Sequence, residues 1–591
     1  MTFSKESSDT NCWYDAQISM RDGVKLAANL YFPKGKEERF PVILNVTPYG
    51  KDSIFRTEVR SMFRSFARAG YAVAHVDVRG RGNSEGEFTP YFQEINDGHD
   101  CIEWIGQQEW STGKVGTIGR SYGGCAQLYP MRHGSKYHKA AFVMCSPSIH
   151  PFHDCTVYTN GTFMPLMISW AMLLSGRTLK EEIYDQEVDW DAIHNIRPLK
   201  SIAKRLGLRK DPYALFYSHE TYDDFLRSVW SDDMISRMKV PCYFVSGWYD
   251  DSLKGALDHF PALTKHPDKK FRSKHKLLIG PWPHALSAPF NRSGKLGDFD
   301  YGPQSVVPLD KEAMRWFDYW LKGINNGIMK EPKVRLFLMG KNRWISSNEF
   351  PLSSTRRLRL FLSAEGPSIS LFGHGRLVDD NHVLSKFSKS TFTYDPANAA
   401  PSAFSKGVFQ NGTNEDLRPI QRRDDVLVFT SAPLEKPLNV LGEVYAKLFA
   451  STSAVDTDFI TRLSDVHPNG YAQRLCQGVS RLRYREGYEH IKLVKPNTIV
   501  TVDLDMWATG QQFQKGHRVR LEVTSSALPW VAPNYNTGLS LWDEKEPIVA
   551  TQTIYHSKRF PSCVLLPEIM NPKFVEAWTE SRWESLLHHQ H

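Results

Sequence analysis

A serine stands in a pattern that exposes a nucleophile. Residues 119–124 read Gly-Arg-Ser-Tyr-Gly-Gly, after a short apolar segment and before a helical pattern. A G-x-S-x-G sequence at a turn from strand to helix forms a nucleophile elbow, which holds the serine oxygen above a sheet at a helix N-terminus. Small residues are needed because the turn is tight. A plain tight turn is the competing interpretation, and the flanking elements favour the catalytic one.

A serine nucleophile needs a base, and the base needs a carboxylate that holds its tautomer. In α/β-hydrolases the acid and then the histidine follow the serine, each just past the C-terminal end of a strand. Asp250 closes an apolar segment that begins at residue 241, and His284 follows the apolar run at 277–279. We therefore predict Ser121 as nucleophile, His284 as base and Asp250 as orienting acid. Asp251 is the rival to Asp250, and its simpler role is that of a solvated turn carboxylate.

The tetrahedral intermediate of acyl transfer needs two hydrogen-bond donors. One is the backbone N–H of the residue after the nucleophile, Tyr122. The other should come from the loop after the strand at 41–47, where no glycine-rich run stands and the sequence reads Thr-Pro-Tyr-Gly from 47 to 50. The hydroxyl of Tyr49 can fill that role. From the pattern alone, Tyr49 is equally well a wall residue of the pocket.

The substrate pocket is expected to take its wall from an apolar segment at residues 163–174. This segment is apolar nearly all round, so core packing explains most of it. Because it should lie over Ser121, we expect Trp170 and Met167 to line an acyl or alcohol pocket. Trp248, two residues before Asp250, is a further candidate for substrate binding.

The elements around these residues predict an α/β domain with an insertion. Apolar strands and helices alternate over residues 1–149 and again over 239–348, which is typical of a parallel sheet covered on both faces. Residues 150–238 have helical spacing and many aromatic residues, and we interpret them as a helical cap. Short strands separated by turns occupy 349–571 and predict an all-β sandwich or barrel. The remaining residues, 572–591, form a C-terminal extension without an assigned role.

Several motifs resemble those of the CocE/NonD family of serine hydrolases. They are GRSYGG at 119–124, GWYD at 247–250, GPWPH at 280–284, PYG at 48–50, DVRGRGNSEG at 77–86 and MRWFDYWLKG at 314–323. This family includes a bacterial cocaine esterase, X-Pro dipeptidyl peptidases, α-amino-acid ester hydrolases and glutaryl-cephalosporin acylases. The resemblance spans nearly the whole chain and implies an α/β-hydrolase domain, a helical cap and a C-terminal jelly roll. It also implies that Tyr49 is the side-chain donor of the oxyanion hole.

The resemblance has one departure that bears on the substrate. Amino-acid ester hydrolases place acidic residues shortly after the catalytic aspartate to hold an ammonium group, whereas Ser252 and Leu253 occupy those positions here. We therefore predict a serine hydrolase for carboxylic esters of small, neutral, fairly apolar molecules. The alternatives are an amide or X-Pro peptide hydrolase, or an acyltransferase, with the same triad. A binding protein without activity is the third interpretation, and the intact Ser–Asp–His order argues against it.

Composition excludes several other classes. The net charge of +8 is spread over 591 residues, and a nucleic-acid binder usually concentrates its excess. The densest arginine runs are at 356–359 and 481–485, and in the second the arginines fall every two residues, on one face of a strand. We interpret this as a solvated sheet face, with a polyanion site as the alternative, and no nucleic-acid partner is expected. The longest apolar stretch has 12 residues, from 163 to 174, against about 20 for a membrane span. No membrane association is expected.

No metal or cofactor is expected either. The run from Gly80 lacks the third glycine of a dinucleotide fingerprint, and the histidines and cysteine of residues 150–155 lack the helical spacing of a metal site. The eight cysteines form no CxxC pair and are interpreted as reduced core thiols of a cytoplasmic protein. A homodimer is retained as a candidate assembly, and the expected partner is a small-molecule ester.

Overall fold

The structure is a computed structural model, and it describes most of the chain. The described residues are 10–34, 39–53, 57–150, 152, 157–184, 187–208, 210–211, 213–230, 234–286, 292–379, 388–402 and 415–575. The interpretation of the histidine-containing loop at 150–155 falls mainly outside these residues.

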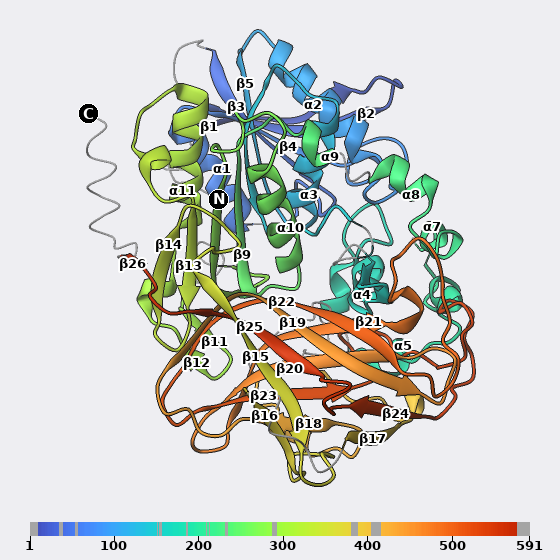
Figure 1. Ribbon diagram of the computed structural model, residues 1–591. Helices are drawn as coiled ribbons and strands as arrows, with labels where there is room; N and C mark the ends of the chain where they lie inside the picture. Colours follow the sequence, from blue (N-terminus) through green and yellow to red (C-terminus); the bar gives the residue numbers. More distant parts are fainter. Residues whose placement is uncertain are drawn as a thin grey trace.

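An eleven-stranded sheet forms the α/β-hydrolase domain, with its central strands parallel (Figure 1). A hairpin supplies two antiparallel strands at one edge. In sheet order the strands are β1 (Thr10–Ser19), β2 (Lys25–Pro33), β4 (Ala72–Asp77), β3 (Phe40–Thr47), β5 (Ser111–Arg120), β6 (His138–Met144), β9 (Cys242–Tyr249), β10 (Lys276–Pro283), β13 (Val334–Leu338), β14 (Arg343–Ser347) and β26 (Phe574–Val575).

Helices cover both faces of this sheet, as the apolar strands predict. Successive side chains of a strand point to opposite faces, so Ile43 packs into the core with α1 whereas Val42 and Leu44 pack into the core with α2. The helices of this domain are α1 (Thr57–Arg68), α2 (Glu94–Gln107), α3 (Tyr122–Leu128), α10 (Leu253–Thr264) and α11 (Leu309–Phe317), followed by a π-helical turn (Asp318–Lys322). Short 3-10 turns and a small hairpin complete it: Tyr129–Arg132, Pro303–Ser305, Ile328–Lys330, β11 (Lys295–Leu296) and β12 (Phe299–Asp300).

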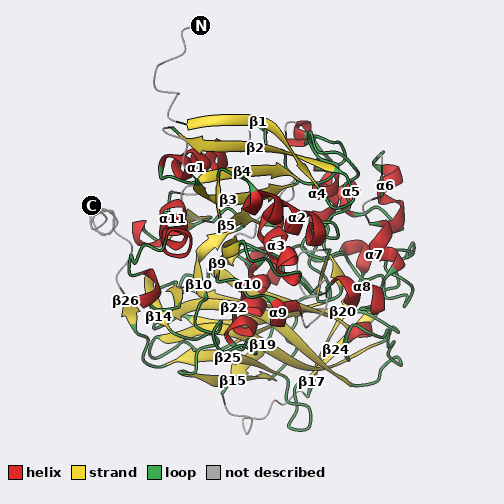
Figure 2. Ribbon diagram, turned by 90° about the horizontal axis from the view of Figure 1, so that it is seen from above, coloured by secondary structure: helices red, strands yellow, loops and turns green. Residues whose placement is uncertain are grey.

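The cap lies between β6 and β9 in the chain and is built of short helices. Figure 2 shows α5, α6, α7 and α8 along one side of the molecule, opposite α11. Its elements are β7 (Tyr158–Thr159), β8 (Thr162–Phe163), α4 (Leu166–Leu173), a 3-10 turn (Glu181–Tyr184), α5 (Trp190–His194), a 3-10 turn (Leu199–Ser201), α6 (Ile202–Arg205), α7 (Ala214–Ser218), α8 (Asp224–Val229) and α9 (Met234–Arg237).

A β domain follows the hydrolase domain and lies beneath it in Figure 1. Its strands are β15 (Thr355–Ala364), β16 (Gly375–Val378), β17 (Lys389–Tyr394), β18 (Leu427–Thr430), β19 (Leu438–Thr452), β20 (Asp458–Val466), β21 (Ala472–Arg481), β22 (Val500–Phe513), β23 (Arg518–Thr524), β24 (Ala550–Tyr555) and β25 (Cys563–Ile569). Short helical turns stand at Pro396–Asn398, α12 (Arg418–Gln421) and Leu482–Tyr484. The predicted α/β domain with a cap and a C-terminal β domain is therefore confirmed.

The arginine run at 481–485 is not the solvated sheet face that its spacing predicted. Strand β21 ends at Arg481, and both Arg481 and Arg483 are buried. Arg481 Nε lies 2.8 Å from Asp458 Oδ1, and Arg483 Nε lies 2.8 Å from Asp456 Oδ2. The alternating arginines of the sequence do not indicate these partners. Asp458 lies in β20 and Asp456 just before it, and the two carboxylates compensate the buried charges.

The start of the expected C-terminal extension has a place in the fold. Phe574 and Val575 form β26, which pairs antiparallel with β14 at the edge of the hydrolase sheet. Two strands of that sheet, β14 and β26, therefore follow β13 in the chain. None of the helices in the described ranges is long and apolar enough to cross a membrane.

Candidate active site

Ser121 occupies a strained turn between β5 and α3. Its backbone has φ 60° and ψ −125°, a conformation that non-glycine residues rarely adopt. A Cβ at Gly119 would lie 2.2 Å from the carbonyl oxygen of Gly123, and one at Gly124 would lie 2.8 Å from that of Met144. The elbow therefore needs glycine at both positions, because the backbone of α3 lies directly against the backbone of β5 and β6 there.

His284 and Asp250 come together just past the ends of neighbouring parallel strands, β10 and β9. Nδ1 of His284 lies 2.7 Å from Oδ1 of Asp250. Two further groups hold the carboxylate: Ser246 Oγ donates to Oδ2 at 2.6 Å, and the backbone N–H of Ser252 donates to Oδ1 at 2.9 Å. An acid fixed in this way orients the imidazole so that Nε2 is the basic nitrogen.

A second carboxylate faces the same imidazole nitrogen. Oδ1 of Asp251 lies 3.0 Å from His284 Nδ1, but the hydrogen bond of this nitrogen goes to Asp250. Burial favours the neutral imidazole, but the carboxylates of Asp251 and Asp250 outweigh it and hold the pKa of His284 well above its ordinary value. Burial also opposes the charge on Asp250, yet the adjacent His284 keeps the pKa of this carboxyl below its ordinary value.

Ser121 and His284 line one cavity of about 180 Å³. Tyr49, Met167 and Trp170 line it as well, so the structure brings these sequence-predicted residues together. Nε1 of Trp170 lies 3.3 Å from the hydroxyl oxygen of Tyr49 and donates to it. This bond orients the phenol on the cavity wall, beside the apolar surface that α4 supplies.

Tyr122 contributes its backbone and its ring to different tasks. It is the first residue of α3, where a backbone N–H has no acceptor within its own helix. Its ring points into the core, where the hydroxyl donates to Glu94 and accepts from the backbone N–H of Tyr91. Burial raises the pKa of Glu94 to about 7. The N–H of Tyr122 is therefore the group available to an oxyanion, and the side chain fixes the helix start.

Trp248 is not where the sequence interpretation expected it. Its indole N–H donates to the carbonyl oxygen of Phe337 at 2.7 Å, and its ring packs close to Gly510 of β22. It is absent from the lining of the Ser121 cavity. Trp248 therefore packs at the contact between the hydrolase and β domains, because the side chains of β9 alternate and only the strand end reaches the cavity.

The cavity has lining residues that the sequence interpretation missed, namely Tyr91, Arg120, Pro147 and Ala285, whereas Leu166 belongs to the apolar segment expected to form its wall. Tyr91 stacks on Trp170 with ring centroids 6.0 Å apart, and its φ of 72° is unusual for a bulky residue. Arg120 Nη1 reaches the carbonyl oxygen of Ala285 at 3.4 Å and so links the elbow to the loop after His284. The position of Arg120 inside the elbow motif was the one signal available for it.

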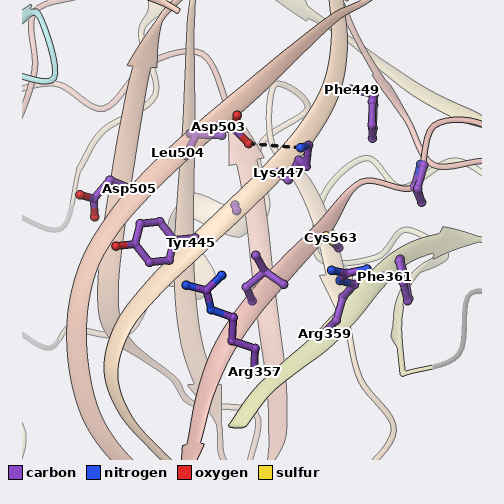
Figure 3. Close-up of a pocket in the computed structure, with 13 residues that line it drawn as sticks. Arg357, Arg359, Phe361, Tyr445, Lys447, Phe449, Asp503, Leu504, Asp505 and Cys563 are labelled. Carbon is purple, nitrogen blue, oxygen red and sulfur yellow. Dashed lines mark ion pairs between the residues drawn. The ribbon is translucent and has the colours of Figure 1, made fainter. Parts of the chain in front are cut away.

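A larger groove, of about 650 Å³, lies on the β domain (Figure 3). Its lining includes Arg357 and Arg359 of β15, Tyr445 of β19 and Asp505 of β22, but no serine or histidine. Cys563 is its one thiol, and burial raises the pKa of that thiol, which opposes formation of a nucleophilic thiolate. The chemistry of acyl transfer therefore belongs to the smaller cavity at Ser121.

Comparisons with known proteins identify the family of the chain. The family model described as X-Pro dipeptidyl-peptidase (S15 family) matches residues 22–286, and the model of the X-Pro dipeptidyl-peptidase C-terminal non-catalytic domain matches 326–565. The chain is 32% identical to the cocaine esterase of Rhodococcus sp. (strain MB1 Bresler) over 578 residues, which cover 94% of this chain and 98% of that protein.

Two solved structures are similar along almost the whole chain. An α-amino acid ester hydrolase has a TM-score of 0.83 at 26% identity, covering 96% of this chain and 98% of its own. A CocE/NonD family hydrolase from Staphylococcus aureus has a TM-score of 0.68 at 18% identity, covering 95% and 94%, and this second likeness concerns the fold alone.

Proposed function

Because the chain belongs to the CocE/NonD family of serine hydrolases, we propose that it cleaves carboxylic esters of small, neutral, fairly apolar molecules through an acyl-enzyme on Ser121. The observation that carries this proposal is the pairing of His284 with Asp250 at 2.7 Å in the wall of the cavity that Ser121 also lines. The 32% identity to an esterase over nearly the whole chain supports the reaction class.

The reaction proceeds in two half-reactions. Oγ of Ser121 attacks the ester carbonyl while Nε2 of His284 takes the hydroxyl proton. The tetrahedral oxyanion is held by the N–H of Tyr122 and the hydroxyl of Tyr49, each worth about 3–4 kcal/mol by analogy with other oxyanion holes. His284 then delivers its proton to the leaving alcohol as the C–O bond breaks. Water repeats the sequence on the acyl-enzyme and releases the acid.

The cavity wall supports a neutral and fairly apolar substrate. Pro147, Leu166, Met167 and Trp170 contribute apolar side chains to its lining. The one carboxylate in the wall, that of Asp251, faces His284 at 3.0 Å. The positions at which amino-acid ester hydrolases carry acids are Ser252 and Leu253 here, and both are buried and absent from the lining. This arrangement offers little to a substrate ammonium group.

A cytoplasmic location is part of the proposal. Seven cysteines in the described part of the chain are free thiols, as expected where thiols are kept reduced.

The substrate class is tested by comparing kcat/KM on p-nitrophenyl esters of short acyl chains with kcat/KM on X-Pro amides, in the presence and absence of a competing alcohol. We expect the esters to be preferred and the free acid to be the main product. A larger kcat/KM on X-Pro amides, or transfer of most of the acyl group to the alcohol, would replace the ester-hydrolase proposal by a peptidase or an acyltransferase.

A further inference from the structure

Three side chains of metal-ligand type meet in the β domain, outside the cavity of Ser121. Strand β20 pairs antiparallel with β23, and Val466 lies opposite Arg518. His467, which follows β20, therefore lies opposite His517, which precedes β23. Asp465 is on the same side of its strand as His467 because strand side chains alternate with a period of two. The ligand atoms of Asp465, His467 and His517 all lie within 4.8 Å of one another.

Neighbouring groups hold this cluster in place. Nδ1 of His517 lies 2.8 Å from Oδ1 of Asp465, whose carboxylate is fully buried. Nε2 of Gln511 donates to the other oxygen of Asp465 at 2.7 Å. The Gln511 side chain is itself buried, and its carbonyl oxygen has no hydrogen-bond partner among the described residues. A carboxylate oriented by an amide in this way is the arrangement found around metal ligands.

We propose that Asp465, His467 and His517 bind one divalent transition-metal ion of the zinc type. Two imidazoles and one carboxylate suit Zn²⁺, Co²⁺ and Ni²⁺ rather than Mg²⁺ or Ca²⁺, which prefer oxygen ligands. A tetrahedral Zn²⁺ site requires ligand atoms about 3.3 Å apart, so small side-chain rotations complete the shell. The open positions fall to water or to the buried carbonyl oxygen of Gln511.

The second histidine is what distinguishes this cluster from an ordinary ion pair. Asp465 and His517 alone would form a stable hydrogen-bonded pair. The ring of His467 lies 4.5 Å from that of His517, and its Nε2 has only a 3.5 Å approach to Gln473 Oε1, at the limit of a hydrogen bond. An ion shared by both imidazoles gives His467 a strong partner and explains why two rings lie together beside one carboxylate.

The role we infer for the ion is structural. Phe299 of β12 packs edge-on against His467 with ring centroids 5.8 Å apart, and Tyr471 donates to Asp298 at 2.8 Å. The cluster therefore lies where the β domain meets the hairpin that follows the His284 loop in the chain. A metal at this point would link the end of β20 to the start of β23, next to that hairpin.

Metal binding to the purified full-length protein tests the proposal. After chelation and dialysis, Zn²⁺ binding is measured by titration calorimetry, and Co²⁺ binding by its visible absorption. We compare the parent with His467→Ala, His517→Ala and Gln511→Ala, and use His374→Ala, an exposed histidine of the same domain, as the matched control. The terminal histidines 588, 589 and 591 stay in every protein, so adventitious binding there cancels in the comparison.

We expect one equivalent of Zn²⁺ to bind at the cluster. Its affinity should fall more than about 100-fold in His467→Ala and His517→Ala, and about 10–100-fold in Gln511→Ala. The control should bind as the parent does, and the same concentration of added Zn²⁺ should raise the melting temperature of the parent and the control more than that of the other three variants. Equal binding by the parent and the two histidine variants would overturn the proposal, as would a parent that binds no Zn²⁺ or Co²⁺. If a histidine variant fails to fold, Gln511→Ala, which keeps both imidazoles, replaces it in the comparison with the parent and the control.

Discussion

The roles of single residues at the cavity separate into proton transfer, orientation and charge stabilisation. Asp250 and Asp251 both face Nδ1 of His284, at 2.7 and 3.0 Å. Only Asp250 is itself held by Ser246 and by a backbone N–H. Asp250 is thus placed to fix the tautomer, whereas Asp251 acts on the base mainly through its charge.

Replacing each aspartate by asparagine should separate these two roles. His284 accepts a proton only when neutral, and the two carboxylates raise its pKa, so activity is lost as the pH falls through that raised value. In Asp251→Asn the pKa of His284 falls, and the acidic limb of the kcat/KM profile should move to lower pH. In Asp250→Asn kcat should fall by about 10⁴-fold, as in serine proteases with the wrong tautomer. A large loss of kcat in Asp251→Asn with little effect in Asp250→Asn would exchange their roles.

Tyr49→Phe tests the side-chain donor of the oxyanion hole. If the hydroxyl acts where negative charge develops, kcat should fall by about 10²–10³-fold with little change in KM. The fold should persist, since the ring remains and only the hydroxyl, which accepts a hydrogen bond from Trp170, is removed. Steady-state kinetics with p-nitrophenyl esters give both constants. A near-normal kcat would reduce Tyr49 to a wall residue and leave the second donor to a backbone N–H.

At the scale of elements, the elbow determines whether the nucleophile is exposed. Gly119→Ala places a Cβ 2.2 Å from a backbone oxygen of α3, so strand and helix must separate. We expect a loss of about 3 kcal/mol or more in the free energy of unfolding, at the upper end for overpacking, together with a large loss of activity. Gly134→Ala is the control, because a Cβ at this position would meet nothing within 4 Å and only the φ of 69° opposes alanine.

Urea unfolding and ester hydrolysis measure the two variants. The control should lose about 1–2 kcal/mol, the cost of a left-handed backbone at a non-glycine residue, and should remain active. If Gly119→Ala is as stable and active as Gly134→Ala, the close contact between β5 and α3 is not what fixes Ser121.

The elbow and the strand ends could be predicted from the sequence because their signals are local. A strand, a G-x-S-x-G turn and a helix follow one another within residues 111–128, and the ends of β9 and β10 carry the acid and the base. The positions of Trp248, Arg481 and Arg483 could not be predicted in this way. The burial of each side chain depends on a partner from another part of the chain, as that of Trp248 does on Phe337. Alternation along one strand does not reveal which face of that strand another element covers.

At the scale of the whole molecule, the β domain packs against the cap that lines the Ser121 cavity. Trp542 is buried among cap aromatics: its ring centroid lies 5.1 Å from that of Phe163 and 6.0 Å from that of Tyr213. The hydroxyl of Tyr213 in turn donates to the carbonyl oxygen of Met167 in α4. Contacts from the β domain therefore reach the helix that carries Trp170.

Trp542→Ala should loosen this connection. Truncation of a buried tryptophan costs about 3–5 kcal/mol, and the displaced α4 should lower kcat/KM for apolar esters. Trp316→Ala is the matched control, because Trp316 is equally buried but packs on Tyr243 and Trp320, in the hydrolase domain. The two should lose comparable stability by thermal unfolding, while only Trp542→Ala loses kcat/KM at a temperature where both are folded. Equal kinetics would show that the β domain does not position the cap.

The central claim is that Ser121 forms the covalent intermediate, and a fluorophosphonate probe tests it most directly. The folded protein is labelled, the adduct is counted by intact mass and its position is found by peptide mapping. We predict a single adduct on Ser121, no adduct in a folded Ser121→Ala variant, and no p-nitrophenyl ester hydrolysis by that variant. A label on a different residue, or a Ser121→Ala variant with full esterase activity, would contradict the claim.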